Sequence, residues 1–279
     1  MLSHRPQCLT LPHDGGPVRV IQITDTHLCA THGGTLLGMD TDHSLQAVVD
    51  LVRHERSEID LVLGTGDLSD QGAIEAYHRA HGYFSQLGEH YYWLPGNHDE
   101  STNMLAIEDT EARMCGEIRI ANWQIIMLDS QLQGEVRGEL GSTELARLQR
   151  VLESGAEQGL FALVCLHHHP IEIGCDWLDE QVVSDADAFF DILQQYPAVK
   201  AVLWGHVHQE VDRIRGGIRL LASPSTCVQF APNSTRFKAD SLAPGYRWLD
   251  LGADGDLQTG VSRVTGVHFN VDLDSQGYL

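Results

Sequence analysis

The stretch WLPGNHDEST, from Trp93 to Thr102, runs from the end of an apolar segment through a Pro-Gly step into Asn97, His98 and Asp99. The apolar segment, HYYWL, predicts a strand, and the Pro-Gly step predicts that the strand ends there. An amide, an imidazole and a carboxylate side by side form either a loop that hydrogen-bonds to itself or part of a binding site. The partners that the rest of the chain supplies decide between the two.

The first hundred residues contain two further apolar segments that end in polar clusters. VRVIQIT predicts a buried strand followed by Asp25 and His27, and IDLVLGTGD predicts a second strand that ends in Asp67. An aspartate after a strand is, taken singly, more often a turn or helix-capping residue than a metal ligand. The clusters therefore have to be judged together.

Helical periodicity follows both of these strands. Leu45 and Val48 fall at helical spacing, with Thr41 or Asp42 as the expected N-cap, and a second helix is predicted over about 72–87. Strands that alternate with helices indicate βαβ units, so we expect parallel strands and an α/β fold.

The second half of the chain is less regular, but two of its strands end in histidines. LFALVC leads to His167, His168 and His169, and VKAVLW leads through a glycine to His206 and His208. The other elements expected here are two strands around Ala121-Asn122, helices over 142–154 (N-cap Ser142) and 185–196, and hairpins turning at Gly216-Gly217 and Asp254-Gly255.

Composition limits the classes of protein and partner. The 279 residues have 42% hydrophobic and 20% charged residues and no internal repeat, which favours a single domain over 1–279, with a less certain tail from about 241. A net charge of −21 argues against nucleic acid or an anionic membrane as partner. The six cysteines form no CxxC pair, and the N-terminus has no signal-peptide pattern, so we expect a cytoplasmic location. The sequence does not indicate an oligomeric state.

Taken jointly, the polar clusters predict a metal site. In an open α/β sheet the ligand crevice lies at the carboxyl ends of the strands, and every cluster follows a predicted strand. Carboxylate, amide and imidazole groups without cysteine suit Mn, Fe or Zn. The candidate metal ligands are Asp25, His27, Asp67, Asn97, one histidine of the 167–169 triplet, His206 and His208. Seven ligands are too many for one such ion, which suggests two.

The ordered series DTH, GTGD, GNHD, HHHP and GHVH resembles the calcineurin-like metallophosphoesterase superfamily, over residues 18–224. Within it, VIQITDTHL, WLPGNHD, LHHHP, GCDWLD, GHVHQE and SPSTCVQF are similar to the bacterial class III 3′,5′-cyclic-AMP phosphodiesterases, to near residue 250. The resemblance implies an αββα sandwich, in which two mixed β-sheets are flanked by helices and the metal site lies at the carboxyl ends of the strands.

The resemblance also implies a role for each ligand. Asp25, His27 and His208 would hold a first metal ion. Asn97, His206 and one residue of the histidine triplet would hold a second, and Asp67 would bridge the two. The motif register favours His167 from the triplet, with His168 next. Alternation along an extended chain places His206 and His208 on the same side, which agrees with these roles.

The implied chemistry is hydrolysis of cyclic AMP to 5′-AMP by a hydroxide that bridges two divalent ions, with Fe and Mn expected and Zn able to compete. His98 would contact a phosphoryl oxygen or protonate the leaving 3′ oxygen. His27, Asn97 and His208 would also face the substrate. Asp99 would hold the loop or orient an imidazole. Two ions at two carboxylates leave a charge of about +2, which would attract an anionic phosphodiester despite the acidic chain.

Two alternatives remain open from the sequence. The same ligands serve relatives that act on other phosphoesters, such as a glycerophosphodiester, a phosphoprotein or a nucleotide polyphosphate. A non-catalytic metal-binding scaffold would be expected to lack ligands or His98, and this chain has them all. For selection of the adenine base, Phe230 in STCVQF and Trp177 in GCDWLD are the candidate contacts.

Overall fold

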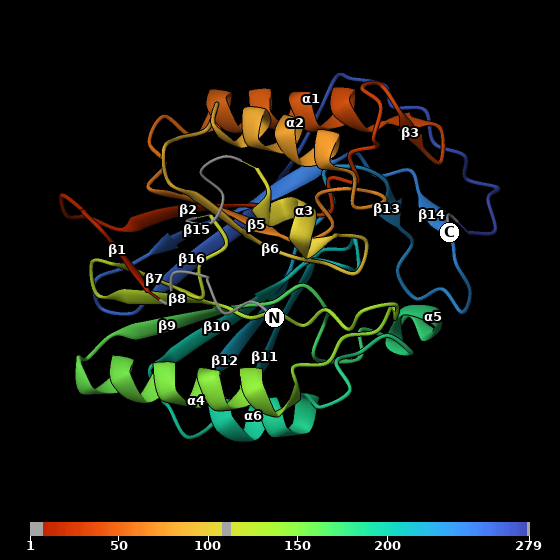
Figure 1. Ribbon diagram of the computed structural model, residues 1–279. Coiled ribbons are helices and arrows are strands. Elements are labelled where there is room, and N and C mark those ends of the chain that lie inside the picture. Colours follow the sequence, from red (N-terminus) through yellow and green to blue (C-terminus); the bar gives the residue numbers. More distant parts are fainter. Residues whose placement is uncertain (1–7, 108–112, 278–279) are drawn as a thin grey trace.

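A computed structural model describes residues 8–107 and 113–277, and within these ranges two large mixed sheets pack face to face (Figure 1). The first has five strands in the order β16-β15-β2-β5-β6. Its strands are β2 (Val18–Ile23), β5 (Leu61–Thr65), β6 (Tyr91–Leu94), β15 (Gly245–Leu251) and β16 (Leu257–Arg263). β2, β5 and β6 run parallel, as the alternation of strands and helices predicts.

The second large sheet has seven strands in the order β1-β7-β8-β9-β10-β12-β11. Its strands are β1 (Leu9–Leu11), β7 (Glu117–Ile120), β8 (Trp123–Met127), β9 (Phe161–Cys165), β10 (Val199–Trp204), β11 (Val211–Arg215) and β12 (Ile218–Ala222). β8, β9 and β10 run parallel, so β9 and β10 present their carboxyl ends at the same edge. Short hairpins add β3 (Thr35–Leu36) with β4 (Met39–Asp40), and β13 (Gln229–Phe230) with β14 (Ala239–Asp240).

Helices cover the outer face of each sheet and complete four layers (Figure 1). The helices are α1 (Thr41–Glu55), α2 (Ile74–Phe84), α3 (Ser101–Leu105), α4 (Gly141–Glu157), α5 (Asp176–Asp179) and α6 (Ala186–Leu193). α1 and α2 bury one hydrophobic cluster against the five-stranded sheet, and α4 and α6 bury another against the seven-stranded sheet. A third cluster fills the space between the sheets. The predicted αββα sandwich is confirmed.

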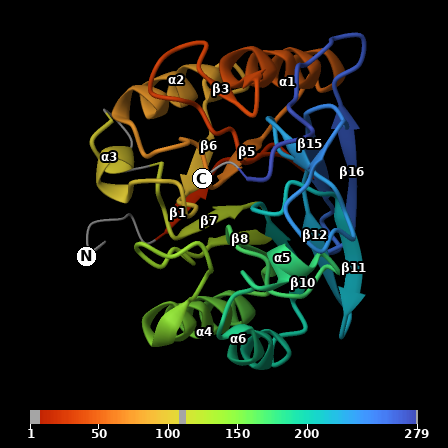
Figure 2. The same ribbon diagram turned by 90° about the vertical axis from the view of Figure 1, so that its right-hand side faces the viewer.

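The predicted turns are confirmed, and they bring the C-terminal region into the first sheet. β7 and β8 pair around Ala121, which has φ 50°, and β11 and β12 pair around Gly216 and Gly217. The last predicted hairpin is β15–β16, and β15 also pairs with β2. Figure 2 shows β11 and β16, an edge strand from each sheet, on the same side of the molecule.

Both predicted helix N-caps are wrong. Each helix begins earlier than predicted, and an acidic side chain accepts hydrogen bonds from backbone N–H groups near its start. The N-cap of α1 is Asp40, whose carboxylate accepts from the His43 N–H at 2.9 Å, so Thr41 and Asp42 lie inside the helix. α4 begins before Ser142. The carboxylate of Asp185 accepts the N–H groups of Leu140 and Gly141, and it comes from a segment distant in sequence.

In the parts of the chain that the structure describes, no helix combines the length and apolar character that crossing a membrane requires.

Candidate metal centre

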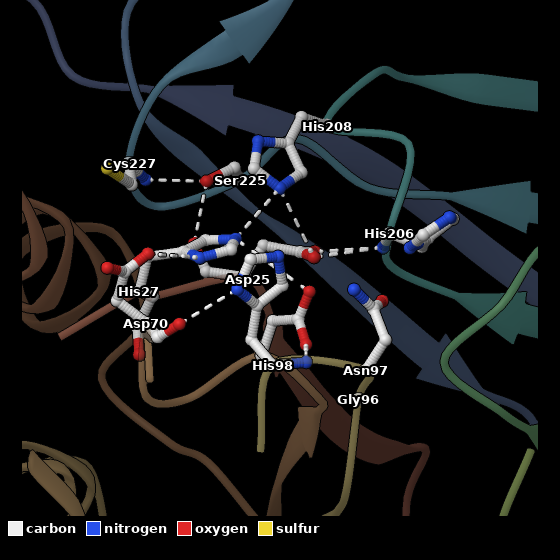
Figure 3. Close-up of polar contacts among 12 residues, drawn as sticks. Asp25, His27, Asp70, Gly96, Asn97, His98, His206, His208, Ser225 and Cys227 are labelled. Atoms are coloured by element: carbon white, nitrogen blue, oxygen red, sulfur yellow. Dashed lines mark hydrogen bonds and ion pairs between the residues drawn. The ribbon is translucent and has the colours of Figure 1, made fainter. Parts of the chain in front are cut away.

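Each predicted polar cluster lies just beyond the carboxyl end of a strand. The first residue of each is Asp25 after β2, Asp67 after β5, Asn97 after β6, His167 after β9 and His206 after β10. Three of these strands belong to the five-stranded sheet and two to the seven-stranded sheet. The clusters therefore meet at one edge where the two packed sheets open, and Figure 3 shows side chains from both converging there.

The backbone of these clusters is held in an unusual conformation. Among the described residues, eight non-glycine residues have positive φ, and five of them are candidate ligands. These five are Asp25 (53°), His27 (43°), Asp67 (51°), His206 (64°) and His208 (48°). Left-handed backbone at residues other than glycine costs free energy and concentrates at functional sites. The strained backbone positions therefore coincide with the edge where the candidate ligands gather.

Glycines in the motifs make room for the ligands. A Cβ on Gly66, which has φ 94°, would overlap the ring of His167, and a Cβ on Gly96 would overlap the carboxylate of Asp67. The glycines of GTGD and GNHD therefore let the backbone of one cluster approach the side chain of another.

Asp25, His27 and His208 form the first close group (Figure 3). His208 Nε2 lies 3.4 Å from Asp25 Oδ1 and 3.2 Å from His27 Nε2. His208 Nδ1 lies 2.6 Å from the carbonyl oxygen of Val228. A carbonyl oxygen only accepts hydrogen bonds, so Nδ1 carries the proton and Nε2 of the neutral ring presents its lone pair to the group.

His27 shows why this group suits a cation. Its Nδ1 lies 3.4 Å from Asp70 Oδ1, and its Nε2 faces the Nε2 lone pair of His208. A neutral imidazole has one N–H, so one of these two contacts joins two acceptors. Burial lowers the pKa of His27, which disfavours the doubly protonated ring. A metal ion beside the Nε2 atoms would remove the conflict.

The second group centres on His167. Its Nδ1 donates to the Thr65 carbonyl oxygen at 2.8 Å, and its Nε2 lies 3.2 Å from both Asp67 Oδ2 and Asn97 Oδ1. Burial would lower the pKa of His167, but the charges of Asp67 and Asp25 and the hydrogen bonds to Asp67 and Thr65 together outweigh burial and raise the pKa to about 9. The ring of His167 therefore carries a proton on Nε2, between Asp67 and Asn97. A metal ion bound to Nε2 would take the place of this proton.

Asp67 lies between the two groups. Its Oδ2 faces His167 and also lies 3.8 Å from His27 Nε2, while its Oδ1 accepts the His98 backbone N–H at 2.9 Å. Burial would raise the pKa of this carboxyl group, but the surrounding imidazoles, led by His167, hold it well below its usual value. The carboxylate is therefore charged and placed where it can contact ligands of both groups.

The three histidines of the triplet have different surroundings. His168 Nε2 donates to the Val136 carbonyl oxygen at 3.1 Å, and its Nδ1 accepts from the Ser130 hydroxyl at 2.8 Å. Both ring nitrogens of His168 are thus committed to other partners, unlike Nε2 of His167. The ring of His169 stacks on that of His206, with centroids 5.5 Å apart and planes inclined by 21°.

His98 lies beside the first group. Its Nδ1 donates to the Asp70 carbonyl oxygen at 2.8 Å, and the edge of its ring meets the His27 ring with centroids 4.8 Å apart. Burial would lower its pKa, but the charge of Asp67 and the bond to Asp70 outweigh burial and raise it. His98 also lies close enough to His27 and Asp67 to form a possible ligand group with them, so its predicted contact with the substrate stays a prediction.

Asp99 bonds to the loops, which is one of the two roles predicted for it. Its carboxylate accepts the backbone N–H groups of Leu68, Ser69 and Gly96 and the hydroxyl of Tyr77, at 2.9–3.2 Å. It thereby ties the loop after β6 to the loop after β5.

Phe230, one of the two candidate contacts for the adenine base, is covered by other side chains. Its ring is 1% exposed and stacks face to face on His208, with centroids 4.1 Å apart and planes inclined by 5°. The motif STCVQF instead supports the first group. Ser225 donates to the Asp25 carbonyl oxygen at 2.7 Å (Figure 3), and the Val228 carbonyl oxygen accepts from His208. Trp177 is half-buried against Phe230.

Sequence reasoning missed three residues that hold the histidines. Asp70 contacts His27 through its carboxylate and His98 through its carbonyl, and its position in GDLSD, three residues after Asp67, was an available signal. Gln181 and Ser130, the partners of His206 and His168, lie in loops where no sequence pattern marks them.

The donor set fits metal ions. Within the described ranges, all four groups of three or more acidic, histidine or cysteine ligand atoms lie at this edge, and the atoms of each are within 4.8 Å of one another. All are nitrogen or oxygen donors, and nearly all are buried. Such a set, with acceptor atoms facing one another, suits divalent ions of the Mn, Fe and Zn type.

Known proteins resemble this chain in sequence and in fold. The chain is 46% identical over 267 residues to the Pseudomonas aeruginosa protein named 3′,5′-cyclic adenosine monophosphate phosphodiesterase CpdA, covering 96% of this chain and 97% of that one. The protein of the same name from Escherichia coli K12 is 44% identical over 274 residues, covering 97% and 98%. A dimetal phosphatase from Danio rerio has the same fold, with a TM-score of 0.64 at 15% identity over 89% of this chain and all of that one.

The description of the calcineurin-like phosphoesterases matches residues 18–210, which run from the first strand of the five-stranded sheet to just beyond His208. That range contains every side chain of the two ligand groups. The resemblance seen in the ordered motifs is thereby confirmed, and the chain belongs to the calcineurin-like phosphoesterase family.

Proposed function

We propose that this protein hydrolyses 3′,5′-cyclic AMP to 5′-AMP at a centre of two divalent metal ions. The substrate rests on the names of relatives that are 44–46% identical over nearly the whole chain. The chemistry rests on one observation, the convergence of buried nitrogen and oxygen acceptors from both sheets at one edge.

We assign the ligands by which lone pairs face each group. Asp25, His27 and His208 would hold one ion, and Asn97, His167 and His206 the other, with Asp67 contributing to both. His167 is preferred to His168 because its Nδ1 N–H bonds to Thr65, so that Nε2, which lies toward Asp67 and Asn97, could bind an ion once it loses its proton. Both nitrogens of His168 are bonded elsewhere.

Bound divalent ions would supply positive charge for the phosphate and lower the pKa of the attacking water. The carboxylates of the chain reduce the net positive charge at the site. Asp25 and Asp67 contribute −2 and Asp70, beside His27, a further −1, so two divalent ions leave about +1. This is less than the value expected from the ligands alone, but it remains favourable to an anionic phosphodiester.

His98 would act on the substrate. Since the Asp70 carbonyl engages Nδ1, we assign the substrate contact to Nε2, which would donate to a phosphoryl oxygen or protonate the leaving 3′ oxygen. Asp70 orients this ring through its carbonyl and His27 through its carboxylate. His27, Asn97 and His208 border the same space and would contact the phosphate together with His98.

The proposal extends to the identity of the metal ions. We propose Fe and Mn, because the site mixes imidazole with hard oxygen ligands and the sequence has the family's ligand pattern; Zn would compete on affinity. The cytoplasmic location expected from cysteine usage stays a prediction.

A hydrolysis panel tests the function. Metal-reconstituted protein would be offered cyclic AMP, cyclic GMP, 2′,3′-cyclic nucleotides and a glycerophosphodiester, with products separated by chromatography. We expect turnover of cyclic AMP to 5′-AMP that a chelator abolishes and added Mn²⁺ restores. Formation of 3′-AMP, or efficient cleavage of the glycerophosphodiester without turnover of cyclic AMP, would overturn the proposal.

A further inference from the structure

The histidines at the metal centre differ in what holds their outer nitrogen. His167, His208 and His98 each donate from Nδ1 to a backbone carbonyl oxygen, that of Thr65, Val228 or Asp70 respectively. His206 instead has a side-chain partner: its Nε2 lies 2.8 Å from Oε1 of Gln181. A side-chain partner can be exchanged by mutation without altering the backbone.

The orientation of the Gln181 amide is fixed by a second contact. Its Nε2 donates to the Trp177 carbonyl oxygen at 3.3 Å, which only accepts hydrogen bonds. The amide oxygen must therefore face His206, and His206 must carry its proton on Nε2. The lone pair of the neutral ring is then on Nδ1.

The surroundings of His206 do not themselves select this tautomer. Its ring packs against those of His167, His168 and His169, with centroid separations of 5.1, 4.8 and 5.5 Å. These contacts restrict the plane of the ring but act equally on both tautomers. His206 is 4% exposed, so an N–H that lost its acceptor would be left buried.

We propose that Gln181 is the positioning residue of the second metal site: its amide oxygen holds the proton of His206 on Nε2 and aims Nδ1 at the metal ion. This inference rests on the proposed function, because it takes His206 as a ligand of the second ion. It connects the segment after α5, the helix that carries Trp177, to the metal centre. A ligand's outer partner typically changes metal affinity or activity by about 10–100-fold.

Metal titration of three variants tests the proposal. Apo protein would be titrated with Co²⁺, following binding by calorimetry and the visible spectrum, for wild type, Gln181→Leu, Gln181→Glu and the control Gln195→Leu. Gln195 makes the same contact to the carbonyl four residues earlier, that of Asp191, on exposed surface. The thermal midpoint of each apo protein shows whether the fold is kept.

We expect wild type and Gln195→Leu to bind two ions alike. Gln181→Leu should bind one ion normally and the other about 10–100-fold more weakly. Gln181→Glu, which keeps an acceptor for the His206 N–H, should restore the second site. If Gln181→Leu does not fold, Gln181→Asn, whose shorter amide cannot reach His206, should show the same selective loss.

Other results overturn the inference. Unchanged affinity in Gln181→Leu, equal weakening of both sites, or a loss in Gln181→Glu as large as in Gln181→Leu would each show that Gln181 does not position His206. A wild-type protein that binds no ions or does not hydrolyse cyclic AMP would instead refute the proposed function, so the two failures are distinguishable.

Discussion

The two sheets contribute different chemistry to the metal centre. The carboxyl ends of the five-stranded sheet supply all the candidate oxygen ligands, Asp25, Asp67 and Asn97, together with His27. The seven-stranded sheet supplies imidazoles only, His167, His206 and His208. The two proposed sites each draw on both sheets, because His208 joins Asp25 in one and His167 joins Asp67 in the other.

This division shows what the packing of the sheets achieves. The buried hydrophobic cluster between them sets the distance between oxygen donors on one side and nitrogen donors on the other. The metal centre is therefore a property of the interface between sheets. Variants at the two sides should differ in how many ions they affect, and four predictions follow that difference.

The largest effect is expected on the five-stranded side, at the carboxylate shared by both groups. Asp67→Ala should lose both ions and activity to below detection, because Asp67 Oδ2 faces His167 and His27. Metal content and turnover of cyclic AMP measure this. Asp185→Ala, which removes a carboxylate that bonds Leu140 and Gly141 at the start of α4, should keep two ions. Two ions in Asp67→Ala would contradict the shared role.

His98→Ala should keep both ions but lower kcat by about 10²–10⁴-fold, the usual effect of removing a positioned acid or base. The expected separation of metal content from rate follows from the substrate contact proposed for Nε2 of His98. Metal analysis and steady-state kinetics on the same sample measure it. The measurement is decisive because His98 also lies close enough to His27 and Asp67 to serve as a ligand. Loss of metal in proportion to activity would make His98 a ligand.

On the seven-stranded side, adjacent histidines should behave differently. His167→Ala should lose one of the two ions. His168→Ala should retain two and lose about 10–100-fold in activity, since His168 packs on His206 and bonds to Ser130 and Val136. Metal stoichiometry distinguishes them. The opposite pattern would reverse the assignment within the triplet.

The smallest functional effect is expected at Phe230. Phe230→Leu should leave the ratio of kcat/KM for cyclic AMP and cyclic GMP within about threefold of wild type, because the buried ring stacks on His208. Lost aromatic contacts should lower stability by about 1 kcal/mol, seen in the thermal midpoint. A large change in this ratio would show that the ring of Phe230 contacts the base of the substrate.

The features that could be predicted from the sequence are those that depend on residues close together in the chain. The ends of the strands before Asp25, Asp67 and His206 can be predicted because each apolar segment stops at polar residues. Parallel pairing can be predicted because these segments alternate with helices. The hairpins follow from Gly216-Gly217 and Asp254-Gly255, since each turn depends on adjacent residues.

What the sequence could not provide depends on contacts between distant segments. The first N–H groups of α4 are bonded by the carboxylate of Asp185, and the partners of His206 and His168 are Gln181 and Ser130. Sequence spacing carries no information about such pairs. Phe230 looked available for a base because an aromatic residue in a motif does not reveal which face is covered.

Anomalous diffraction from crystals grown with Mn²⁺ tests the central claim most directly, that one centre is assembled from both sheets. We predict two peaks on either side of the Asp67 carboxylate. Asp25, His27 and His208 should surround one, and Asn97, His167 and His206 the other. A single ion, or two ions whose ligands all come from one sheet, would contradict the account.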